Sequence, residues 1–192
     1  MKFLRRAGRS FRSWRFRYRL VRRWKGRGRL TLGAGNAFEA PVRSDGAGSL
    51  SIGSGNSFGY GMAPRFGDGE ILLQARAPGS VVSIGSNNAF SNNVSVIANE
   101  RIVIGNDCLI GDRVSIFDSD FHEIDPAARR SGTGASKPVE IGNNVWIGSS
   151  VIVLKGVTIG DNSVIGVMSV VNKPVPPNSV AVGNPAKVIR TL

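Results

Sequence analysis

The side chain best suited to proton transfer in this chain is His122, the one histidine of the sequence. Histidine is the residue whose unperturbed charge change falls near neutral pH, so it serves as a general base without special surroundings. Asp120 lies two positions earlier, on the same face if the segment is extended. We therefore predict that His122 is catalytic. Two roles stay open for Asp120, which either orients the imidazole or only shapes the turn.

Other familiar catalytic patterns are missing from the sequence. One His with one Asp falls short of the three or four ligands of a zinc site, so no metal is predicted. No Ser or Cys has a second signature residue for a covalent triad, and no phosphate-binding loop of the P-loop or dinucleotide type is present. The single cysteine, Cys108, excludes an internal disulfide and is interpreted as a small buried hydrophobe.

The elements that must position His122 are indicated by a six-residue period. Apolar residues recur without a miss at Ile141, Ile147, Val153, Ile159, Ile165 and Val171. This period fits neither an amphipathic helix nor an alternating strand. It fits a triangular coil in which each side is one hexapeptide and each turn takes about 18 residues. We predict an all-β protein, a parallel β-helix, over residues 30–192.

One long excursion interrupts the predicted coil. Ile104, Ile110 and Ile116 keep the six-residue step, and Ile141 resumes it, so the chain leaves the coil at about 117–138. Excursions from a repeat array are where function tends to be placed. His122 lies in this segment, which we predict to be the active-site loop.

The N-terminal segment differs sharply from the rest in charge. Residues 1–29 hold 13 of the 25 Lys and Arg and no acid, although the net charge of the whole chain is +12. Residues 3–25 are predicted to form a basic amphipathic helix whose apolar face is lined by aromatic and aliphatic side chains: Phe3, Ala7, Phe11, Trp14, Tyr18 and Val21. Two interpretations stay open, an anionic membrane surface and packing against protein. No nucleic-acid partner is predicted because no nucleic-acid-binding motif is recognisable.

The sequence lacks an apolar run of 18 residues and the apolar stretch of a secretory signal. We therefore expect a cytoplasmic protein, peripheral at the inner face of the membrane if the basic helix binds lipid.

Three segments of the sequence resemble a known family. Lys137–Gly148, Leu154–Gly166 and the tail Val182–Arg190 are similar to the hexapeptide-repeat acyltransferases. The resemblance is strong over 82–190 and extends to maltose- and galactoside-type O-acetyltransferases and to sugar acetyltransferases of surface-polysaccharide biosynthesis. It implies a left-handed β-helix, acetyl-CoA as donor substrate, and a homotrimer.

The resemblance also implies site residues. It identifies His122 as the histidine of the loop that leaves the coil, with Trp146 as the tryptophan near it and Asn93 as an asparagine near the acceptor. The positions that line the coenzyme A channel in the family fall on Ser149, Val167, Asn172, Lys173, Lys187 and Arg190. The cations among them suit the phosphates of coenzyme A.

Two features depart from the family pattern or stay open. Ala-Gly usually follows the Ile-Gly pair, whereas this chain has Val167-Met168, which leaves donor geometry and acyl length undecided. Arg129, in the Arg129-Arg130 pair of the excursion, is interpreted either as a contact for an anionic acceptor or as exposed charge.

The function expected from all of this is transfer of acetyl from acetyl-CoA to a saccharide hydroxyl, with His122 as general base and no covalent intermediate. A backbone N–H of Gly148 or a neighbour is expected to stabilise the oxyanion. N-acylation of an amino sugar is one alternative. A catalytically silent trimeric scaffold at a membrane surface is another.

Overall fold

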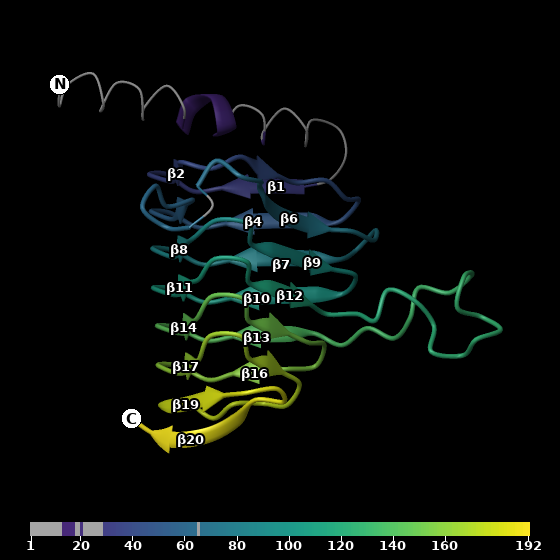
Figure 1. The fold of residues 1–192 in the computed structure, drawn as a ribbon. Coiled ribbons are helices and arrows are strands. Elements are labelled where there is room, and N and C mark those ends of the chain that lie inside the picture. The colour runs from purple at the N-terminus through teal and green to yellow at the C-terminus, as the bar shows by residue number, and fades with distance from the viewer. Residues whose placement is uncertain (1–12, 18–19, 21–28, 65) are drawn as a thin grey trace, which may run out of the picture.

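The computed structural model describes residues 13–17, 20, 29–64 and 66–192. Its strands stack into a three-sided prism, one coil above the next (Figure 1). The first sheet contains β1 (Arg29–Leu32), β4 (Ser49–Ile52), β7 (Val81–Ile84), β10 (Arg101–Ile104), β13 (Val139–Ile141) and β16 (Thr158–Ile159).

The second sheet contains β2 (Ala37–Phe38), β5 (Ser57–Phe58), β8 (Ala89–Phe90), β11 (Leu109–Ile110), β14 (Trp146–Ile147), β17 (Val164–Ile165), β19 (Ser179–Val182) and β20 (Lys187–Thr191). The third contains β3 (Val42–Arg43), β6 (Ile71–Ala75), β9 (Ser95–Ala98), β12 (Ser115–Phe117), β15 (Ile152–Val153) and β18 (Val170–Val171). The neighbouring strands pair in parallel, except that β20 turns back antiparallel to β19 at the C-terminal end.

The predicted period fills the interior of the prism. All six predicted positions from Ile141 to Val171 are buried, which confirms the period as the core signal. Nearer the N-terminus, three phenylalanines stack in the same column, with ring centroids 5.1 Å apart for Phe38 and Phe58 and 5.0 Å for Phe58 and Phe90. Each coil therefore buries its apolar side chains on those of the next coil.

Left-handed backbone conformations mark the corners of the coils. Between the first and second sheets, which we call the first corner, the residues with positive φ are Gly35, Gly55, Asn87, Asp107, Asn144, Asn162 and Asn178. Between the second and third sheets, the second corner, positive φ occurs at Asn93, Arg113, Ser150 and Met168. Glycine, Asn and Asp tolerate this conformation and other residues adopt it at a cost. The third corner, between the third and first sheets, is where the excursion leaves.

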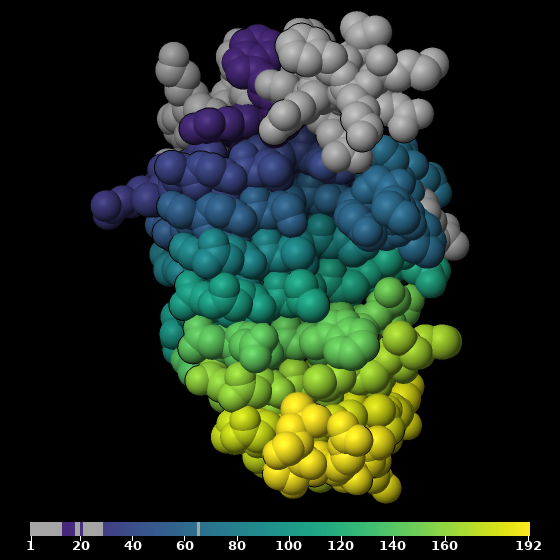
Figure 2. Space-filling model, turned by 90° about the vertical axis from the view of Figure 1, so that its left-hand side faces the viewer, coloured from purple at the N-terminus to yellow at the C-terminus, as the bar shows by residue number. Residues whose placement is uncertain are grey.

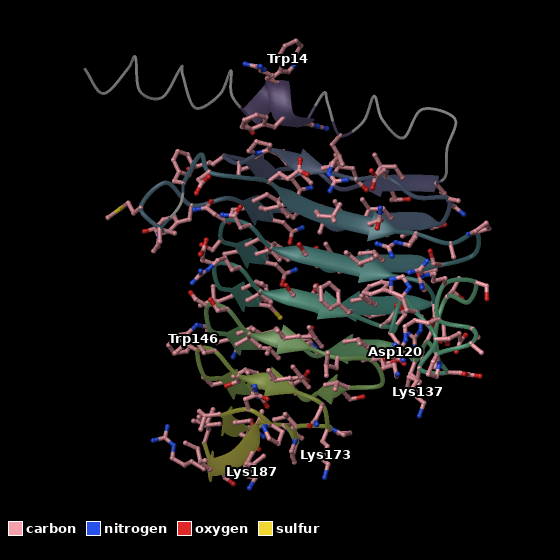
Figure 3. The ribbon with its side chains drawn as sticks, turned by 45° about the vertical axis from the view of Figure 1, so that its right-hand side comes forward. Trp14, Asp120, Lys137, Trp146, Lys173 and Lys187 are labelled. Carbon is pink, nitrogen blue, oxygen red and sulfur yellow. The ribbon has the colours of Figure 1, made fainter. Side chains whose placement is uncertain are left out.

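The described part of the N-terminal segment lies against the first coil. Residues 13–17 are helical, Leu20 is fully buried in the core, and Phe16 packs against it. The Ser13 hydroxyl oxygen accepts a hydrogen bond of 2.9 Å from the Phe38 N–H. Trp14 is 61% exposed and points away from the prism (Figure 3). The described face that packs on the first coil is thus that of Phe16 and Leu20, and Trp14 of the predicted apolar stripe is not part of it.

The other members of the predicted apolar stripe, Phe3, Ala7, Phe11, Tyr18 and Val21, lie outside the described residues. Within the part of the chain that is described, no helix is long and apolar enough to cross a bilayer.

Candidate active site

The excursion begins with a clamped carboxylate at the third corner. Between β12 and β13 the chain runs far out from the prism (Figure 1). At its base, the fully buried Asp118 accepts backbone N–H groups of the preceding coil, from Asn99 at 2.7 Å and from Glu100 and Arg101 at 2.8 Å. These three bonds fix where the excursion departs, because a buried carboxylate left unpaired would be costly.

The imidazole of His122 has a defined hydrogen-bond partner. Its Nδ1 lies 3.2 Å from the backbone carbonyl oxygen of Arg129, within the same excursion. A carbonyl oxygen only accepts, so Nδ1 carries the proton in the neutral ring and Nε2 keeps its lone pair. The His122 side chain is exposed. A neutral imidazole with an accessible Nε2 is the form that a general base requires.

Asp120 contacts a lysine rather than the imidazole. Its Oδ2 forms an ion pair with the Nζ of Lys155, in the third-corner turn of the following coil. Its backbone N–H donates to the Ala135 carbonyl at 3.1 Å. Of the two roles left open for Asp120, the contacts correspond to shaping the loop, because the Arg129 carbonyl occupies the orienting position beside His122.

At Gly134, next to His122, the packing leaves no room for a side chain. Gly134 has φ +73°, and a Cβ there would lie 2.6 Å from the His122 carbonyl oxygen and 3.0 Å from the Asp120 Cβ. The returning part of the excursion therefore approaches the outgoing part as closely as only glycine permits.

Three of the residues implied by the family resemblance lie at the second corner, away from His122. Asn93, Ser149 and Val167 occupy this corner in three coils, and the Met168 N–H donates to the Ser149 carbonyl at 3.0 Å. Val167 is 67% and Met168 75% exposed, so this corner presents apolar side chains to solvent. The expected oxyanion donor, Gly148, has its N–H bonded to the Ile165 carbonyl at 2.8 Å, so that expectation is wrong for Gly148 itself.

The remaining implied residues are spread over the C-terminal coils. Trp146 on β14 is 55% exposed and lies across the prism from Asp120 (Figure 3). Asn172 and Lys173 follow β18 at the third corner, and Lys187 and Arg190 lie on β20, all exposed. One copy of the chain therefore brings His122, Asp120 and Arg129 together, but it does not bring Trp146 to His122.

Sequence reasoning missed two residues that hold the loop, Asp118 and Lys155. The available signal for Asp118 was its place directly after the last strand residue, Phe117, where a carboxylate can accept orphan N–H groups. Lys155 carried no signal, since its partner is distant in sequence.

Cys108 is buried, as interpreted from its place in the repeat. Burial raises the pKa of its thiol, which disfavours the reactive thiolate. Among the residues that the structure describes, no group of three His, Cys, Asp or Glu side chains gathers as a metal site would need.

Comparison with known proteins supports the reading of the repeat. The family model "Bacterial transferase hexapeptide (six repeats)" matches residues 138–173. The galactoside O-acetyltransferase of Escherichia coli is 44% identical over 114 residues, which are 59% of this chain and 56% of that protein. A putative acetyltransferase of Schizosaccharomyces pombe is 50% identical over 91 residues, 47% of this chain and 44% of that protein. The chain thus spans about half the length of the curated relatives it matches.

Solved structures share the fold over most of the chain. A galactoside acetyltransferase in complex with coenzyme A is 33% identical, with a TM-score of 0.54, over 84% of this chain and 65% of that one. A hexapeptide-repeat acetyltransferase of Vibrio cholerae complexed with acetyl coenzyme A is 26% identical, with a TM-score of 0.61, over 97% and 88%. The fold is the left-handed parallel β-helix that we expected. In its repeats over residues 138–173 and in its fold, the chain is similar to hexapeptide-repeat acetyltransferases.

Proposed function

We propose that this protein transfers acetyl from acetyl-CoA to a hydroxyl group of a saccharide, with His122 as the general base. The observation that carries the proposal is the Nδ1 contact of His122 with the Arg129 carbonyl, which leaves Nε2 unprotonated and exposed. The relatives named galactoside O-acetyltransferase and the solved neighbours with bound coenzyme A support the donor and the acceptor class.

The proposed step needs no covalent enzyme intermediate. The acceptor O–H gives its proton to the Nε2 of His122 while its oxygen attacks the thioester carbonyl carbon of acetyl-CoA. The tetrahedral intermediate collapses, the C–S bond breaks, and the imidazolium returns the proton to the thiolate of coenzyme A. Holding acceptor and thioester together supplies a large part of the rate.

We also propose that the site is completed by a second copy in a homotrimer. Trp146 and the second corner lie across the prism from the excursion, so one copy cannot offer them to its own His122 (Figure 3). The outer face of the second sheet carries an apolar column in register, Leu109, Trp146 and Val164, with Leu109 53% exposed. The first sheet carries Glu140 and Thr158 at the same level. An exposed apolar column on a flat sheet is typical of an interface.

Coenzyme A binds, in this proposal, along the C-terminal coils. Ser149 and Val167 line the second corner, and Trp146 lies three residues before Ser149. Lys173, Lys187 and Arg190 are exposed cations in the same coils and would hold the phosphates, with Asn172 beside Lys173. Asn93 and Arg129 are proposed to face the acceptor.

The basic segment 1–29 is proposed to hold the protein at an anionic membrane surface. In its described part, Trp14, Arg15 and Arg17 are exposed while Leu20 is buried in the core. In residues 13–17 and 20, one face is therefore covered by protein and another lies in solvent. Deletion of residues 1–26 should abolish binding to vesicles containing anionic lipid, and unchanged binding would contradict this part of the proposal.

Release of free thiol from acetyl-CoA tests the proposed activity. Wild type and His122→Ala are assayed side by side with a panel of sugars and amino sugars, and coenzyme A binding is measured by calorimetry. We expect release that depends on a sugar and falls about 10²- to 10⁴-fold in His122→Ala. Release with amino sugars only would instead assign N-acylation. Absence of both coenzyme A binding and release would favour the silent scaffold, to which the bulky Val167-Met168 pair points.

A further inference from the structure

We propose that Arg76 and Phe121 are positioning residues that set the orientation of the His122 imidazole. This inference deepens the proposed function and rests on it only for its kinetic readout. Arg76 directly follows β6, which lies two coils before β12, the strand from which the excursion departs. Phe121 directly precedes His122. Neither residue belongs to the acceptor or donor sites proposed above.

Phe121 adopts a backbone conformation that phenylalanine rarely takes. Its φ is +63°, in the left-handed region. A bulky side chain there is an outlier, because the Cβ crowds the following carbonyl oxygen. Such strain persists only where the surroundings hold the residue in place, and it clusters at functional sites. The contacts of the Phe121 ring should therefore account for the conformation.

Two contacts hold the ring. The guanidinium carbon of Arg76 lies 4.6 Å from the ring centroid, within the range of a cation–π contact. On another side, Phe117 of β12 meets the ring edge to face, with centroids 5.4 Å apart. The Phe121 ring is half-buried by these neighbours, whereas the next residue, His122, is exposed. The left-handed backbone of Phe121 thus joins its own held ring to the exposed imidazole of His122.

Arg76 is itself held by a chain of polar contacts on the outside of the third sheet. Its Nε–H donates to the Gln74 Oε1 at 2.9 Å, and the Gln74 Nε2 donates to the Asp45 Oδ1 at 2.6 Å. Asp45 pairs with Arg43 at 3.1 Å, and Arg43 pairs with Glu70. The Glu70 carboxylate raises the pKa of the Arg43 guanidinium. The cation over Phe121 therefore belongs to a network that begins in the N-terminal coils.

The network connects the excursion to a second loop, the one between β5 and β6. Glu70 lies at the end of the segment between β5 and β6, whose described residues, 59–64 and 66–70, bulge from the second corner, in blue at the upper right of Figure 2. Phe121 lies near the base of the excursion at the third corner. The polar chain from Glu70 to Arg76 crosses the third sheet between these corners.

The consequence for His122 follows from the backbone. A left-handed residue reverses the chain direction locally, so it decides where the next side chain points. With Phe121 in this conformation, the His122 Nδ1 reaches the Arg129 carbonyl. Without the Arg76 contact, Phe121 can return to an unstrained conformation, and the imidazole then loses the carbonyl that selects its tautomer.

The contact is not needed to anchor the excursion. Asp118 already clamps the outgoing end to the preceding coil, and Ser119 pairs with Ser136 across the base. Removal of the Arg76 guanidinium should therefore leave the fold intact, which makes the test specific for orientation.

The presence of a single histidine allows a direct readout. Nitrogen-15 NMR of uniformly labelled protein reports which imidazole nitrogen of His122 carries the proton, because no other histidine signal overlaps. We expect wild type to show predominantly the Nδ1–H form when neutral, and Arg76→Gln and Phe121→Leu to shift toward the Nε2–H form typical of an unrestrained histidine. Phe121→Tyr keeps the aromatic ring and should show the same signal as wild type.

Arg101→Gln is the matched control. It removes an arginine whose guanidinium pairs with Glu140 on the outside of the first sheet, whereas the cation over the Phe121 ring is Arg76. This variant should leave both the imidazole signal and the activity unchanged. The same tautomer ratio in Arg76→Gln as in wild type would overturn the inference, whether or not the protein proves to be an acyltransferase.

Kinetics separate the inference from the proposed function. We expect Arg76→Gln and Phe121→Leu each to lower kcat about 10-fold with little change in either KM, because positioning acts on the base and not on binding. The double variant should lose no more than either single variant. If His122→Ala abolishes transfer while Arg76→Gln keeps the full kcat, the proposed function stands and the inference fails. If His122→Ala retains transfer, the proposed function fails, and the NMR signal alone decides the inference.

Discussion

The first and second corners solve the same geometric problem with different residues. Both need a left-handed residue in coil after coil. The first corner uses only Gly, Asn and Asp, whereas the second places Arg113, Ser150 and Met168 in this conformation. Each of these three costs about 1–2 kcal/mol relative to an unstrained residue. The residue types at the left-handed positions of the first corner thus favour stability. Those of the second corner do not, so stability alone does not explain them.

The first corner adds a second stabilising device, a ladder of buried amides. The Asn88 N–H and its side-chain amide both donate to the Asn56 Oδ1, at 2.8 and 3.0 Å. Asn56 donates in turn to the Asn36 Oδ1 and the Gly85 carbonyl, each at 3.0 Å. At the second corner, Val167 and Met168 instead face solvent. We propose that the second corner differs because it meets a ligand or another copy.

The largest effect is expected inside the amide ladder. Asn56→Ala leaves the buried N–H of Asn88 and the Gly85 carbonyl without their partner, which should cost about 3 kcal/mol of unfolding free energy. Chemical denaturation measures this loss. The kinetic constants of the folded variant should match wild type. Ser57→Ala, at the next residue, which begins β5 and is half-buried, is the control and should change the stability little.

A smaller loss is expected at the rim of the first corner. Asn144→Ala puts a Cβ-bearing residue without an amide at φ +52° and removes the bond to Asn162. The expected cost is about 1 kcal/mol, measured by the same denaturation. Stability equal to wild type would show that this corner is not tuned for its backbone conformation.

The opposite sign is expected at the matching position of the second corner. Met168→Gly relieves strain at φ +58° and should raise the unfolding free energy by about 0.5 kcal/mol, because glycine's extra unfolded-state entropy offsets part of the gain. The KM for acetyl-CoA should change as well, since Met168 faces solvent beside Ser149. A variant that is destabilised, with an unchanged KM, would remove the distinction between the two corners.

The smallest effect concerns Cys108, where the first corner takes a thiol in place of an amide. Burial raises its pKa in the folded state, so the unfolded chain loses the proton first as the pH rises. The associated stability is fully present below about pH 9 and is lost above it. Denaturation of wild type and Cys108→Ala at pH 8 and pH 10 should therefore show a steeper decline for wild type. Parallel declines would contradict the raised pKa.

The coil could be predicted from the sequence because its signal is local and repeated. Each of the six positions from Ile141 to Val171 independently predicts an inward-facing side chain, so a wrong prediction at one position would not change the predicted fold. The excursion has no such repeat. Its contacts, Lys155 with Asp120 and Arg76 with Phe121, join residues far apart in the chain, and charge or ring type alone does not select a partner.

The site was predictable in its residue types but not in its assembly. His122 stood out by its uniqueness and its place in the loop, whereas its partner is a backbone carbonyl, which leaves no trace in a sequence. Trp146 was expected near His122 and lies across the prism from Asp120 instead. Spacing along one chain carries no information about a neighbouring copy, and the proposed trimer is what would bring these residues together.

The most direct test of this account is the activity of mixed assemblies. Chains carrying His122→Ala and chains carrying Ser149→Trp, which blocks the second corner, are co-expressed with different tags, and assemblies holding both are isolated. Each variant alone should release little thiol from acetyl-CoA. Mixed assemblies should regain part of the wild-type rate, since one interface pairs an intact His122 with an intact second corner. Mixed assemblies no more active than the separate variants would contradict a site shared between copies.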